Sequence, residues 1–170
     1  MATPQTGRTL QMNGNRSRLT VLGIGNILMS DDGIGVRVME AVRDAREWGQ
    51  DVEFIDGGAG GLGLLNVIED AQAMIVFDAA DMGLSAGQFR VITPEQASAD
   101  TQGRISMHDA PFLETLALCE QFSRRPEEVL ILAIQPKIVD FGRGFSDELT
   151  AAFDGIVGVA EGLVSSKSAG

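Results

Sequence analysis

Short apolar runs alternate along the chain with segments whose apolar residues recur at helical spacing. These runs include Ala73–Phe77, which is continuously apolar, as is typical of a strand covered on both faces of a parallel sheet. They predict strands at Leu19–Gly23, Val52–Ile55, Ala73–Phe77 and Val129–Ile134. The amphipathic segments predict helices from Gly33 to about Trp48, from Leu62 to Glu69, from Pro111 to Gln121, and from a cap at Ser146 to near the end of the chain.

This alternation predicts an α/β fold, a three-layer α/β/α sandwich around a mostly parallel, twisted sheet of about five strands. The fifth strand is expected at Gly87–Thr93. Its connection to the preceding Ala73–Phe77 strand is too short for a helical crossover, so we expect it to run antiparallel to that strand.

The chain has 170 residues, enough for one domain with a buried core. Residues 1–17 are polar and lack the hydrophobic centre of a signal peptide, so we expect a disordered extension there. The domain is expected to span residues 18–165, followed by a flexible tail at residues 166–170. No apolar run in the sequence is long enough to cross a bilayer.

Thirteen basic residues against twenty-four acidic ones give a net charge of −11. Nucleic acid and anionic membranes attract basic surfaces, so neither is an expected partner. The single cysteine, Cys119, excludes an internal disulfide and a multi-cysteine zinc site. We therefore expect a soluble, cytoplasmic monomer.

A glycine-rich turn follows the first strand and leads into two adjacent carboxylates, Asp31 and Asp32. Gly23 and Gly25 resemble the start of a dinucleotide-binding fingerprint, but Leu28 stands where the third glycine belongs. The two carboxylates would also repel a pyrophosphate at the helix N-terminus. The turn is better suited to holding a cation or a proton.

Three carboxylates fall at corresponding places, since Asp32 follows the first strand, Asp56 ends the second and Asp78 ends the third. Any one of them alone is better explained as a residue that starts a loop or caps a helix. Parallel strands would bring all three to one edge of the sheet. Such a group of carboxylates is costly unless a cation or a shared proton neutralises it.

His108 is the only histidine and stands just before the predicted helix at Pro111–Gln121. A lone histidine is more often a surface or core residue, but a helix N-terminus favours the neutral imidazole that binds metal. With two carboxylates it would form a nitrogen and oxygen site suited to nickel or zinc. The sequence shows no serine-nucleophile or zinc-protease motif. The side chain of Cys119 is expected to be buried and to pack in the core.

The motifs together resemble the [NiFe]-hydrogenase maturation endopeptidases, the proteases that process the C-terminus of the hydrogenase large subunit. The resemblance extends from about Leu19 to the last helix. It rests on Gly23-Ile24-Gly25-Asn26-Ile27-Leu28 with Asp31-Asp32-Gly33-Ile34-Gly35, on Asp56-Gly57-Gly58, on Phe77-Asp78-Ala79 and on His108-Asp109.

This resemblance implies that Asp32, Asp78 and His108 bind nickel and are catalytic. It also implies that Asp56 is one of the catalytic residues and contributes to processing by shaping the cleft. The expected reaction removes a short C-terminal extension from the large-subunit precursor after nickel insertion. Nickel is then presented by the substrate, and other divalent ions could replace it in vitro. The family is sometimes grouped with aspartyl proteases, although the Asp-(Thr/Ser)-Gly pair of pepsin-like enzymes is absent here.

Two other functions remain open on the sequence, a non-catalytic nickel chaperone of hydrogenase assembly and a nucleotide-binding module. The sequence does not identify the hydrogenase isoenzyme that is served. We expect its recognition to be spread over loops such as Asp81–Gln88 and Asp140–Phe145.

Overall fold

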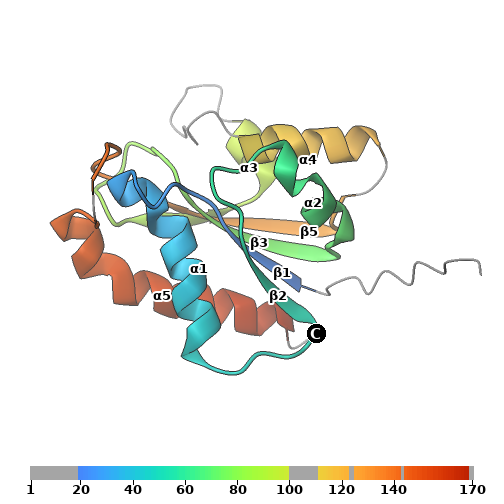
Figure 1. The fold of residues 1–170 in the computed structure, drawn as a ribbon, viewed down its shortest axis with the longest axis horizontal. Helices are drawn as coiled ribbons and strands as arrows, with labels where there is room; N and C mark the ends of the chain where they lie inside the picture. Colours follow the sequence, from blue (N-terminus) through green and yellow to red (C-terminus); the bar gives the residue numbers. More distant parts are fainter. Residues whose placement is uncertain (1–18, 100–110, 123–124, 143, 169–170) are drawn as a thin grey trace, which may run out of the picture.

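The computed structural model describes residues 19–99, 111–122, 125–142 and 144–168. Five strands form one sheet in the order β2-β1-β3-β5-β4, with helices on both faces (Figure 1). The four parallel strands are β1 (Leu19–Gly23), β2 (Val52–Asp56), β3 (Ala73–Ala79) and β5 (Glu128–Ile134), and β4 (Phe89–Ile92) pairs antiparallel with β5. The predicted α/β class, with a mostly parallel sheet, is confirmed.

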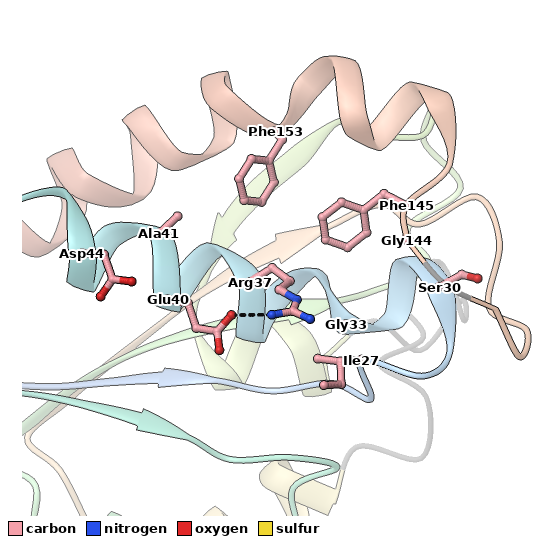
Figure 2. Close-up of a pocket in the computed structure, with 10 residues that line it drawn as sticks. All are labelled: Ile27, Ser30, Gly33, Arg37, Glu40, Ala41, Asp44, Gly144, Phe145 and Phe153. Carbon is pink, nitrogen blue, oxygen red and sulfur yellow. Dashed lines mark hydrogen bonds and ion pairs between the residues drawn. The ribbon is translucent and has the colours of Figure 1, made fainter.

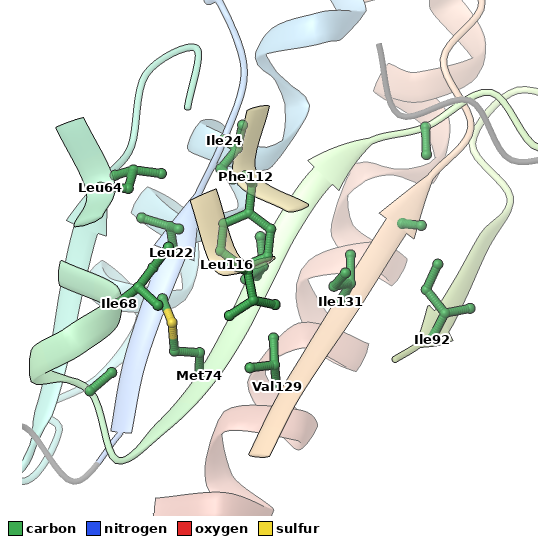
Figure 3. Close-up of a cluster of buried hydrophobic side chains, with 14 of the residues drawn as sticks. Leu22, Ile24, Leu64, Ile68, Met74, Ile92, Phe112, Leu116, Val129 and Ile131 are labelled. Atoms are coloured by element: carbon green, nitrogen blue, oxygen red, sulfur yellow. The ribbon is translucent and has the colours of Figure 1, made fainter. Parts of the chain in front are cut away.

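Helices α1 and α5 cover one face of the sheet, and α2 and α4 cover the other (Figure 1). The core on the α2 and α4 side contains Phe112 and Leu116 packed over Met74 and Val129 (Figure 3). The helical segments are η1 (Ser30–Gly33), α1 (Ile34–Ala45), η2 (Leu62–Leu64), α2 (Leu65–Asp70), α3 (Pro94–Ser98), α4 (Pro111–Gln121) and α5 (Asp147–Ser168), where η marks a 3-10 turn.

Several element boundaries differ from the sequence prediction for local reasons. Helix α1 ends at Ala45, because the backbone is extended at Arg46 and the Trp48 indole turns back to donate to the Val42 carbonyl at 2.9 Å. Helix α5 continues to Ser168, into the segment expected to be a flexible tail. The predicted extension at residues 1–17 lies outside the described residues.

Strand β4 runs antiparallel to β3, as predicted, but its neighbour is β5, which lies between the two.

The short helix α3 was not predicted. It begins at Thr93, whose hydroxyl accepts from the Gln96 amide while the Gln96 side chain accepts from the Thr93 amide. This reciprocal cap, with Pro94 in the first turn, stabilises a helix too short to show an apolar period.

Among the described helices, α5 alone is long enough and apolar enough to span a bilayer. Core helices of soluble proteins also meet these two criteria of length and mean hydropathy. Its fully buried residues pack in the core under α1 and are Leu149, Ile156, Ala160 and Val164. The apolar character of α5 is therefore accounted for in part by the fold.

Candidate active site

The carboxyl ends of β1 and β3 meet at one edge of the sheet, where Gly23 is in register with Phe77. The turn η1 follows β1 and carries Asp32, and Asp78 is the next residue after Phe77 in β3. Both carboxylates line one cavity of about 130 Å³. The other lining residues come from the same edge and are Ile24, Gly25, Ala59, Ala79, Pro111 and Phe112. The prediction that Asp32 and Asp78 converge is thus confirmed.

Two glycines allow η1 to lie directly on the strands. Gly25 has φ +137°, and a Cβ atom at this position would stand 1.9 Å from the Asp32 carbonyl oxygen. A Cβ atom at Gly35 would stand 2.2 Å from the Phe77 carbonyl oxygen. No side chain fits at either place, so the glycine spacing sets how closely Asp32 approaches the end of β3.

Asp32 is half-buried and oriented by the preceding loop. Its Oδ2 accepts from the Asn26 amide at 2.8 Å, and the Asn26 side chain accepts in turn from the Leu28 amide at 3.0 Å. The Asn-x-Leu part of the motif therefore forms a turn that fixes one carboxylate oxygen. The other oxygen of Asp32 has no hydrogen bond to the described part of the chain that would hold it away from the cavity.

Burial raises the pKa of Asp78 to about 8, and the nearby charge of Asp32 adds to the shift. A hydrogen bond from the Ala79 amide acts in the opposite direction. At neutral pH the metal-free pair therefore carries a proton on Asp78, since two close carboxylates do not both ionise readily. The same arrangement can exchange that proton for a cation, or use it in acid–base chemistry.

Asp31 has a role that sequence reasoning missed. Its side chain is fully buried and accepts from the Lys137 and Ile138 amides at 2.8 and 2.9 Å. It also accepts from the amide and hydroxyl of Ser146 at 2.7 and 2.9 Å. Burial acts to raise the pKa of Asp31, but these donors, the Ser146 amide first, lower it. Of the two adjacent carboxylates, Asp31 holds the fold together and Asp32 faces the cavity.

Asp56 lies at the end of β2 but does not line the cavity. Its exposed side chain accepts from the Gly58 amide at 2.8 Å, within its own turn. That turn is joined to the first motif, because the Gly57 amide donates to the Gly23 carbonyl and the Gly25 amide donates to the Gly58 carbonyl. The Asp56 carboxylate therefore shapes this loop, and its expected contribution to processing stays a prediction.

His108, the third expected metal ligand, lies outside the described residues. Among the residues that are described, no three His, Cys, Asp or Glu side chains form a group able to hold a metal ion. Cys119 is buried in the core under α4, as predicted, and burial, followed by the charge of Glu69, raises the pKa of its thiol. It is not a nucleophile in this state.

A larger cavity of about 300 Å³ lies between α1 and α5 (Figure 2). Phe145, Phe153 and Ile27 form apolar walls, and Arg37 is paired with Glu40 at 2.8 Å. Neither Asp32 nor Asp78 reaches it. Asp78, the half-buried titratable group with a strongly raised pKa, lines the smaller cavity, which is the candidate active site because such groups mark functional sites.

The fold and this cavity define a class, an α/β/α sandwich with an aspartate-based site at the carboxyl edge of a parallel sheet. The sequence model of the hydrogenase maturation protease family matches residues 36–162. The chain belongs to that family, and it is an endopeptidase that processes the C-terminus of a hydrogenase large subunit.

Individual relatives agree with this assignment. The chain is 36% identical over 145 residues to the hydrogenase expression/formation protein HupD of Rhizobium leguminosarum bv. viciae, covering 84% of this chain and 70% of the relative. It is 28% identical over 138 residues to the hydrogenase 2 maturation protease of Escherichia coli, covering 81% and 84%. The structure of the hydrogenase maturating endopeptidase HybD from E. coli superposes with a TM-score of 0.75 over 88% of this chain and 93% of that one, at 23% identity, and so supports the fold.

Proposed function

We propose that this endopeptidase cuts the C-terminal extension from a [NiFe]-hydrogenase large-subunit precursor only after nickel insertion, and that Asp32, Asp78 and His108 recognise the inserted ion. The precursor, as the partner, brings the nickel to the enzyme. The observation that carries the proposal is the Asp32–Asp78 pair, in which Asp78 is kept protonated in an open cavity.

The chemistry of the donors supports this role. Two carboxylates and one imidazole make a nitrogen and oxygen set that suits a divalent ion of the nickel or zinc type. Three protein ligands leave coordination positions open, as a site that meets an ion already held by another protein requires. The approaching ion would displace the proton of Asp78, so the pair responds to the charge of the ion rather than to the peptide sequence alone.

Asp56 is given an indirect role in this proposal. Its hydrogen bond to Gly58 shapes the turn that is attached to Gly23 and Gly25, and Gly25 lies directly against the Asp32 backbone. We place the reaction in the cytoplasm and propose that the enzyme acts as a monomer.

Substitutions that keep side-chain volume test the proposal. Asp78→Asn and Asp32→Asn should each slow removal of the extension by about a hundredfold or more, because each removes a ligand charge. Asp56→Asn keeps the acceptor for Gly58 and should retain most activity, and Cys119→Ala should remain active. The measurement is the mass of the large subunit over time, with circular dichroism to show that each variant is folded. An active Asp78→Asn variant would contradict the proposal.

A further inference from the structure

Four large apolar side chains are exposed together on two loops beside the active site. Leu28 is 55% exposed and Phe141 is 79% exposed, and Ile27 and Ile138 are nearly half exposed. Ile27 and Leu28 lie in the loop after β1, and Ile138 and Phe141 lie in the loop after β5. We call these four residues the loop patch.

Hydrogen bonds and a β-bridge hold the backbone of the two loops that carry the loop patch. The Gly142 amide donates to the Leu28 carbonyl at 3.0 Å, and Met29 and Gly142 form an isolated β-bridge. The Asp31 amide donates to the Ile138 carbonyl at 3.0 Å, and the Asp31 carboxylate accepts from the Ile138 amide at 2.9 Å. The apolar side chains are therefore displayed from an ordered backbone, which lowers the entropy cost of binding a partner.

The loop patch lies next to the turn η1 that carries Asp32, and one of its residues lines the larger cavity. Leu28 lies two residues before η1 (Ser30–Gly33), and a Cβ atom on Gly33, the residue after Asp32, would stand 2.8 Å from the Ile27 Cα atom, so this loop packs closely on η1. On the other side, Ile27 forms a wall of the 300 Å³ cavity together with Phe145 and Phe153 (Figure 2). The loop patch therefore lies beside both the larger cavity and the turn that carries Asp32.

We infer that the loop patch binds the C-terminal extension of the large-subunit precursor, through apolar side chains of that extension. This inference rests on the proposed function, because an extension cut at Asp32 and Asp78 has to pass this edge of the sheet. The carboxylates of Asp32 and Asp78 and the net charge of −11 disfavour an acidic peptide, so the bound segment is apolar with neutral or basic neighbours.

A second copy of this chain is a poorer occupant. Four partly exposed side chains supply less area than the roughly 800 Å² per partner that a standard-size interface buries. Exposed apolar patches of this smaller size are instead typical of peptide and partner binding sites on monomers.

The test compares two exposed phenylalanines at opposite ends of the structure. Phe141→Ala removes the most exposed side chain of the loop patch, and Phe122→Ala removes a side chain that is 70% exposed just after α4, toward the amino end of β5. Single-turnover cleavage of nickel-loaded precursor is measured over a range of enzyme concentrations. Phe141→Ala should raise the half-saturating concentration about tenfold or more while leaving the rate at saturation within about twofold of the original enzyme. Phe122→Ala should change neither.

Binding of the mature large subunit, which lacks the extension, should not depend on Phe141. An unchanged half-saturating concentration for Phe141→Ala, equal effects of the two variants, or equal dependence of precursor and mature subunit on Phe141 would overturn the inference. So would a dimer of the enzyme that Phe141→Ala dissociates in analytical ultracentrifugation. Cleavage of nickel-free precursor, run in parallel, reports on the proposed function alone and does not affect this comparison.

Discussion

The carboxylate of Asp31 accepts hydrogen bonds from both the amide and the hydroxyl of Ser146, at 2.7 and 2.9 Å, across 115 residues of sequence. Ser146 is the residue immediately before α5, and Asp31 immediately precedes Asp32, which lines the candidate active site. The contact therefore joins the turn that carries Asp32 to the start of the longest helix. It is a structural restraint on the active site rather than part of the reacting group.

Asp31→Asn should destabilise the protein strongly although it changes only one atom. An amide NH₂ group cannot accept a hydrogen bond from the four donors around the carboxylate. At least one of these donors would therefore be left unpaired in a buried position. We expect the free energy of unfolding to fall by about 2–4 kcal/mol. Urea denaturation measures this, with Asp56→Asn as the matched control, since Asn can still accept from the Gly58 amide. A loss no larger than that of the control would contradict the role assigned to Asp31.

Gly25→Ala should disturb the active site through the backbone. The added Cβ atom would stand 1.9 Å from the Asp32 carbonyl oxygen, so the turn has to move and Asp32 with it. We expect processing to be lost, together with about 2 kcal/mol or more of stability. Gly63→Ala is the control, because a Cβ atom there meets nothing within 4 Å and its φ is not positive. Gly25→Ala with normal activity and melting temperature would show that the turn is not constrained as described.

The raised pKa of Asp78 makes the stability of the metal-free protein depend on pH. The group has a pKa of about 8 in the folded protein and an ordinary value of 3.8, so between these pH values the folded state holds the extra proton. The free energy of unfolding should consequently decrease as pH rises from about 4 to 8. Above pH 8 the Asp78 carboxyl group is ionised in both the folded and the unfolded state, so its effect no longer changes with pH.

Asp78→Asn should abolish this part of the pH dependence. In metal-stripped protein near pH 8.5 the variant should be the more stable one, by at least about 2 kcal/mol, whereas near pH 4 the two proteins should be nearly equal. Chemical denaturation at a series of pH values provides the measurement, and Asp56→Asn should follow the original protein throughout. If Asp78→Asn were no more stable than the original protein at pH 8.5, the carboxyl group would not be protonated at neutral pH.

Much of the fold could be predicted because its signals are local. The short apolar run of β1 and the proline at the start of α4 predicted both elements with their observed bounds. Parallel strands also brought Asp32 and Asp78 to one edge, as any doubly covered sheet of this topology does. The neighbour of β4 was not predictable in this way, because strand order depends on which edge of the sheet is free rather than on the length of one connection.

The division of roles among the carboxylates was also beyond the sequence. Asp31 and Asp32 are adjacent, and only the path of the turn decides which of them points into the protein. Asp56 stands at the end of its strand as expected, yet its side chain closes its own turn rather than facing the cavity. Ser146, predicted as a helix cap, proved to be the chief partner of a carboxylate 115 residues away.

The central claim is that the enzyme recognises nickel carried by its substrate. The most direct measurement mixes metal-stripped enzyme with purified precursor, either nickel-free or nickel-loaded, and follows the mass of the large subunit. We predict that only the nickel-loaded precursor is cut, with no metal added to the enzyme, and that nickel-free precursor stays intact even at high enzyme concentration. Equal cleavage of the two precursors would contradict the claim and leave an aspartate-dependent endopeptidase that does not sense the metal.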